Sequence, residues 1–85
     1  MTPIVGVKWE DAHGSDGTIF KHEVDHRPYI FTTVGFLVRS DTEGVSLAME
    51  EGADGKVRDV TFIPRRMIVK EFAISPRKRK EPNLT

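Results

Sequence analysis

The sequence predicts a mainly β protein in which five short strands form one small barrel. Apolar and polar side chains alternate over several short runs, which is the pattern of a half-buried strand. Turn residues, mostly Gly, Asp and Pro, separate these runs. The chain has 85 residues, which fits a single domain. A sheet of five strands that closes on itself also removes the exposed edges through which strands aggregate.

The first strand is expected from Pro3 to Trp9, with apolar residues at alternate positions from Val5. Residues 10–28 form an irregular insert that begins with turn residues. A short helix from about Thr18 to His26 fits this insert, with Asp16 as its N-cap and its end at Pro28. An extended excursion fits the same residues.

The strongest strand signal runs from Tyr29 to Ser40, which is rich in β-branched and aromatic residues. Gly35 in its middle indicates a sharp bend or a close approach of another backbone. Both faces of this strand carry apolar side chains, namely Ile30, Val34, Phe36 and Val38 on one and Tyr29, Phe31 and Leu37 on the other. A strand with two apolar faces is covered on both. The insert at 10–28 or a neighbouring subunit could supply the second cover.

The remaining strands follow turn signals. A tight turn is expected at 41–44, and a strand with Val45, Leu47 and Met49 in phase follows it. Asp54 and Gly55 predict a hairpin turn. The next strand is expected over 56–63, with a bulge near Asp59 because the apolar phase shifts there, and the last strand over 67–74.

Composition predicts one domain over residues 1–75 and a flexible basic tail over 76–85. The body holds nine Lys or Arg against twelve Asp or Glu, whereas the tail holds four basic residues and one acidic residue. The body therefore lacks the electrostatic footprint of a nucleic-acid binder, and only the tail carries one. The chain has no cysteine, which excludes disulfides and thiolate zinc sites. With no signal-peptide pattern and no long apolar run, we expect a cytosolic protein that does not enter a membrane.

Two stretches resemble the paired motifs of Sm and Sm-like proteins. Gly35-Phe36-Leu37 followed by Asp41 is similar to the opening of the first motif, and residues 62–68 (Phe-Ile-Pro-Arg-Arg-Met-Ile) are similar to the second. Residues 5–74 also resemble small phage and prophage proteins of unassigned role. These share the Trp9-Glu10-Asp11 start, the strand 34–37 and the turn 63–68. The resemblance implies a five-stranded SH3/Sm-like barrel that self-assembles, in the host cytoplasm if the gene is phage-encoded.

The chain departs from the Sm pattern where that family binds RNA bases. No Asn follows the first motif, and Pro64-Arg65 replaces the Arg-Gly pair of the second. The fold and the self-assembly are therefore expected here, and the family's RNA pocket is not.

Residues 22–26 match the H-E-x-x-H pattern of zinc hydrolases, in which His22 and His26 would bind the metal and Glu23 would act as base. The context is poor because Pro28 stops a helix at once and the two histidines would lie opposite the apolar Phe20 and Val24. The solvated-loop interpretation is favoured, so we expect no catalytic residue, no metal and no cofactor.

The basic run Arg77, Lys78, Arg79 and Lys80 could contact phosphates, and Arg65 and Arg66 could extend such a patch. A charged terminus is more commonly a solvated tail. For self-association the candidates are Tyr29, Phe31 and Phe36. The sequence thus favours a non-enzymatic, self-associating binding or assembly module, with nucleic acid or a host protein as further candidate partners. RNA binding is the first alternative and zinc hydrolysis the second.

Overall fold

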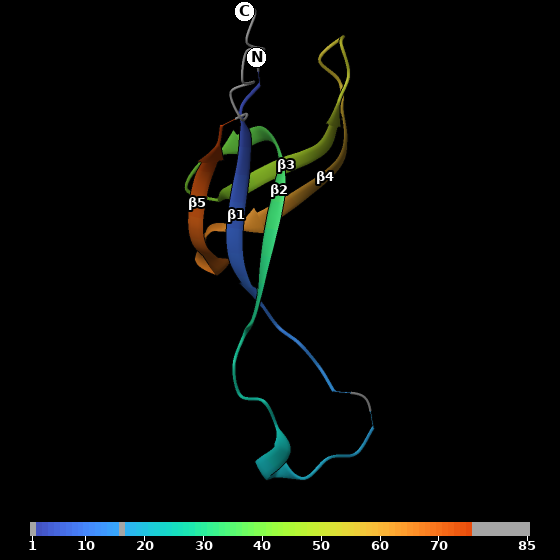
Figure 1. Cartoon of the computed structure of the whole chain (residues 1–85), viewed down its shortest axis with the longest axis vertical. Coiled ribbons are helices and arrows are strands. Elements are labelled where there is room, and N and C mark those ends of the chain that lie inside the picture. The colour runs from blue at the N-terminus through green and yellow to red at the C-terminus, as the bar shows by residue number, and fades with distance from the viewer. Residues whose placement is uncertain (1, 16, 76–85) are drawn as a thin grey trace, which may run out of the picture.

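The computed structural model describes residues 2–15 and 17–75. Five strands in this part of the chain form one antiparallel sheet with the order β4-β3-β2-β1-β5 (Figure 1). Helical structure in residues 2–15 and 17–75 is limited to two single 3-10 turns. The elements are β1 (Ile4–Asp11), η1 (Lys21–Glu23), β2 (Tyr29–Ser40), β3 (Gly44–Glu51), β4 (Val57–Pro64), η2 (Arg65–Met67) and β5 (Ile68–Ile74). All five predicted strands are confirmed to within two residues at their ends.

The core lies on one face of this bent sheet. Five side chains from β1, β3 and β4 form it, and each is at most 7% exposed: Val5, Val7, Val45, Leu47 and Ile63. Four partly buried side chains pack against them, namely Trp9, Leu37, Met67 and Ile68. Burying an aliphatic side chain stabilises a fold by about 1.5–3 kcal/mol, so this small cluster is the main source of stability.

The predicted close approach at Gly35 is confirmed. A Cβ atom built on Gly35 would lie 2.7 Å from the carbonyl oxygen of Ala48 on the neighbouring strand β3. A side chain at this position would therefore separate β2 from β3. Just beyond it, the register between these strands shifts between Leu37 and Arg39, which places a bulge at Val38.

The bulge expected near Asp59 is not present as a shift of register. Glu50 lies opposite Arg58 and Ala48 lies opposite Val60, so β3 and β4 stay in one register across Asp59. Asp59 instead takes a backbone φ of 55°, in the left-handed region that few residues other than Gly, Asn and Asp adopt. The shift of apolar phase in the sequence thus marks a local backbone distortion.

Backbone pairing does not close the sheet into the expected barrel. Within the described residues, β4 pairs only with β3 and β5 pairs only with β1, so both are edge strands. The two are joined through η2, whose first amide, that of Arg65, donates to the carbonyl oxygen of Glu43 at 3.0 Å. The antiparallel five-stranded sheet is the part of the fold prediction that is confirmed.

The insert between β1 and β2 projects away from the sheet as an arm, which we define as residues 12–28 (Figure 1). Of the two alternatives for this insert, the helix over 18–26 does not form and the extended excursion is present: only Lys21–Glu23 form a 3-10 turn, and Phe20 and Val24 on either side are extended. The arm carries no buried residue among those described. It therefore does not supply the second cover that the two apolar faces of β2 require.

Candidate assembly surface

One unbroken row of apolar side chains crosses the whole sheet on the face opposite the core. Directly paired residues of antiparallel strands share a face, and the pairings join Ile74 to Ile4, Ile4 to Phe36, Phe36 to Ala48 and Ala48 to Val60. Every strand of the sheet contributes one member. We call the face that carries this row the outer face.

Further apolar residues widen the row on the same face. Phe62 lies two residues from Val60 on β4, and Val34 lies two residues from Phe36 on β2, so the alternation of a strand places each beside the row. Phe72 of β5 lies over Gly6 of β1, where an added Cβ would collide with its ring. The outer face thus consists of Ile4, Val34, Phe36, Ala48, Val60, Phe62, Phe72 and Ile74.

Much of this face is open to solvent. Val34 is 53% exposed, Val60 49% and Phe62 55%, while Ala48 is buried beneath its larger neighbours. Of the fourteen large hydrophobic side chains that are exposed in the described residues, four belong to this set, namely Ile4, Val34, Val60 and Phe62. Contiguous apolar surface of this kind on a small protein marks a site of interaction.

The three residues predicted for self-association fall into two places. Phe36 lies at the centre of the outer-face row. Tyr29 and Phe31 lie on the other face of β2, with ring centroids 4.8 Å apart, and Phe31 stacks on Trp9 at 5.2 Å. The indole N–H of Trp9 donates to the hydroxyl of Thr33 at 2.9 Å, which fixes this aromatic group near the base of the arm.

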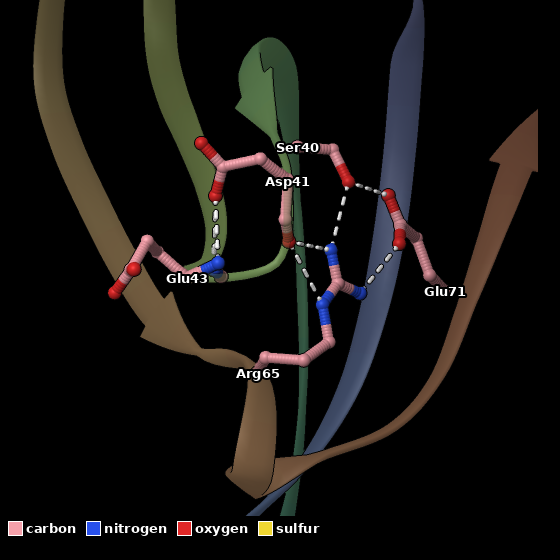
Figure 2. Close-up of polar contacts among 6 residues, drawn as sticks. Ser40, Asp41, Glu43, Arg65 and Glu71 are labelled. Atoms are coloured by element: carbon pink, nitrogen blue, oxygen red, sulfur yellow. Dashed lines mark hydrogen bonds and ion pairs between the residues drawn. The ribbon is translucent and has the colours of Figure 1, made fainter.

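A polar cluster around Arg65 ties separate parts of the fold together (Figure 2). The guanidinium donates to the backbone carbonyl of Asp41 from Nε at 3.1 Å and from Nη2 at 2.7 Å. It also donates to the hydroxyl of Ser40 at 3.0 Å and to the carboxylate of Glu71 at 3.0 Å. These side-chain bonds connect η2, the turn after β2 and the edge strand β5. They join the two ends of the sheet, which have no backbone pairing with each other in the described residues.

Two carboxylates near this cluster have lowered pKa values. The backbone amide of Glu43 donates to Asp41 at 2.9 Å, and this bond is the largest cause of the lowered pKa of Asp41, with Arg39 adding to it. The pKa of Glu71 is lowered by the hydrogen bond from Arg65 first and by that from Ser40 second. Both acids are therefore ionised at neutral pH and act as fixed acceptors.

Of the residues predicted to bind nucleic acid, the structure describes only Arg65 and Arg66, which are neighbours on η2. Arg65 is half-buried and uses its guanidinium within the cluster just described. Arg66 is exposed and forms no ion pair or side-chain hydrogen bond with the described residues. Arg77, Lys78, Arg79 and Lys80 lie outside the described residues.

The H-E-x-x-H residues do not lie on one helical face, because η1 ends at Glu23. His22 is 3.9 Å from the carboxylate of its neighbour Glu23, and their side chains are 80% and 52% exposed. No group of three or more His, Asp or Glu suited to a metal ion occurs in residues 2–15 and 17–75. The helix on which the zinc hypothesis depended is therefore absent.

The outer-face row was missed in the sequence because it depends on strand register. Ile4, Val60 and Ile74 are ordinary alternating residues when each strand is taken alone. Only the pairing of the five strands aligns them with Phe36. The doubly apolar character of β2 was the one signal of this surface in the sequence.

Comparison of the chain with protein-family models, with curated proteins and with solved structures found no match. No helix in the described part of the chain is long and apolar enough to cross a membrane.

Proposed function

We propose that this protein is a non-enzymatic, self-associating assembly module that uses the outer face as an interface between copies. The observation that carries this proposal is the apolar row from Ile74 through Phe36 to Val60, in which Ile4 and Val60 are exposed and Phe36 and Ile74 are half-buried. Two open edge strands support the same proposal, because unpaired strand edges join readily to other strands.

The class that we favour is an Sm-like module of a phage or prophage. The sequence resemblance to Sm proteins supports this class, as does the single antiparallel sheet whose last two strands meet through a short 3-10 turn at Arg65–Met67. Assembly with other copies, rather than chemistry on a substrate, is then its task in the cytoplasm of the host.

Sedimentation equilibrium over a wide range of protein concentration tests this proposal. Val60→Lys places a charge in the outer face, and we expect it to weaken association at least about tenfold, since losing one buried aliphatic contact costs about 1.5–3 kcal/mol. Val57→Lys is the matched control because Val57 lies on the same strand, is 40% exposed and points to the opposite face. A wild-type protein that stays monomeric at all concentrations would reject the proposal.

A further inference from the structure

The tip of the arm is apolar and contacts no other part of the described chain closely enough to be buried. Ile19 is 40% exposed, Phe20 70% and Val24 50%. Thr18, Ile19, Phe20 and Glu23 line a shallow groove at this tip. An apolar tip on a projecting segment costs hydration free energy unless another surface covers it.

Next to the apolar row, the outer face carries two lysines directly opposite each other. Lys8 of β1 pairs with Lys70 of β5, and neither lysine forms an ion pair within the described residues. Like charges in direct cross-strand positions are destabilising. The ammonium of Lys70 lies 5.9 Å from the ring centroid of Phe72, so this positive pair adjoins the apolar surface.

The tip of the arm carries the complementary charge. Glu23 lies on the same 3-10 turn as Phe20, because its amide donates to the carbonyl of Phe20 at 2.9 Å. Its carboxylate has only the exposed His22 as an ion partner in the described chain, at 3.9 Å. The arm therefore presents an aromatic ring and a carboxylate side by side.

The spacing of these groups matches across the two surfaces. Three residues of 3-10 helix advance about 6 Å, which separates Phe20 from Glu23. Two residues along a strand advance about 7 Å, which separates the apolar position at Gly6 and Phe72 from the lysine pair. Phe20 can thus lie on the apolar surface beside Phe72 while Glu23 reaches Lys8 and Lys70.

The arm does not reach Phe72 and the lysine pair of its own sheet by continuing in its own direction. It leaves β1 at Asp11 and extends away from the sheet (Figure 1), whereas Lys8 lies three residues back along β1, about 10 Å at the rise of a strand, so the arm would have to fold back to reach its own lysines. A second copy brings an arm to this surface without any bending of the chain.

We propose that the arm of one copy docks on the outer face of a second copy, with Phe20 beside Phe72 and Glu23 between Lys8 and Lys70. This inference rests on the proposed self-association and names the surfaces that perform it. Each copy has one arm and one outer face, so the contact is heterologous: the arm of each copy binds the outer face of the next.

Photo-crosslinking tests the contact directly. We replace Phe20 by the photoreactive p-benzoylphenylalanine in unlabelled protein, mix it with ¹⁵N-labelled wild-type protein, irradiate, and identify the linked peptides by mass spectrometry. We expect links between an unlabelled arm and a labelled peptide from β1, β2 or β5. Links confined to one isotopic form, or links to the core side or to another segment, would overturn the inference.

Charge reversal supplies an independent measurement. Glu23→Lys is expected to weaken association at least about fivefold, about 1 kcal/mol, and Lys70→Glu in the same chain is expected to restore it. Glu51→Lys, on the opposite face of β3, is the matched control and leaves association unchanged. If the wild type associates but neither Phe20→Ser nor Glu23→Lys changes its dissociation constant, the arm contact is wrong and the proposed function stands. A wild type that never associates rejects both.

Discussion

Arg65 donates from Nη1 to Oε2 of Glu71 at 3.0 Å, and this ion pair ties the turn after β4 to the edge strand β5. The same guanidinium holds the carbonyl of Asp41 with two further N–H groups. A planar group with five fixed donors suits such a junction, and a lysine ammonium does not.

Arg65→Lys should therefore destabilise the fold. We expect a loss of about 1–2 kcal/mol, less than the sum of several charged hydrogen bonds because the pair is partly exposed to solvent. Urea denaturation measures the change. Arg66→Lys is the matched control because Arg66 is the exposed neighbour of Arg65. The unfolding free energy of this variant should stay within about 0.5 kcal/mol of that of the wild type. Equal stability of the two variants would show that the cluster does not hold the fold together.

The lowered pKa of Glu71 gives a dependence of stability on pH. The folded-state pKa lies below the ordinary value of 4.5, so the carboxylate contributes its stability fully above that value. The contribution is lost as the pH falls through the lower folded-state pKa. The difference in unfolding free energy between the wild type and Glu71→Gln should be largest near pH 7 and shrink as the pH falls below 4.5. A difference that does not vary with pH would contradict the assigned bond.

Gly35→Ala should be costly because of the close approach of β3. The new Cβ would lie 2.7 Å from the carbonyl oxygen of Ala48, a backbone atom that cannot rotate away. We expect about 1–3 kcal/mol of destabilisation by thermal or urea unfolding. Gly14→Ala in the arm is the control, since nothing lies near its Cβ position. That substitution should be neutral or slightly stabilising.

The nucleic-acid alternative makes a separate prediction about salt. If four tail cations at 77–80 contacted the phosphates of single-stranded RNA, the logarithm of the binding constant would fall with a slope of about −3 against the logarithm of salt. Arg65 is engaged within the fold, so Arg65→Lys should not change that slope. If the protein is only an assembly module, we expect no RNA binding that depends on salt in this way. A steep slope that disappears when residues 76–85 are deleted would favour the alternative.

The sequence predicted the strands well because alternation and turn chemistry act over a few residues. The hairpin at Asp54 and Gly55 is an example: the amide of Gly55 donates to the carbonyl of Gly52, and Gly55 has a φ of 85°. For the arm, the sequence left a short helix and an extended excursion both open. The pattern from Thr18 to His26 fits a helix, but an isolated segment this short gains too little from helix formation without packing against the sheet.

The two surfaces on which the functional proposal rests could not be predicted from local sequence patterns. The pairing of Ile4 with Phe36 and of Lys8 with Lys70 follows from register, which the sequence specifies only through the whole fold. The role of Arg65 was hidden for the same reason, because its partners lie 6, 24 and 25 residues away in the chain.

Intermolecular contacts of the outer face itself test the central claim most directly. In a sample that mixes ¹³C-labelled and unlabelled protein, isotope-filtered NOE spectra report only contacts between copies. We expect such NOEs at the methyl groups of Ile4, Val34 and Val60, with none at the methyl groups of Val57. Outer-face methyl groups that show no intermolecular NOE in a protein sedimenting at its monomer mass of 9.6 kDa would contradict the account.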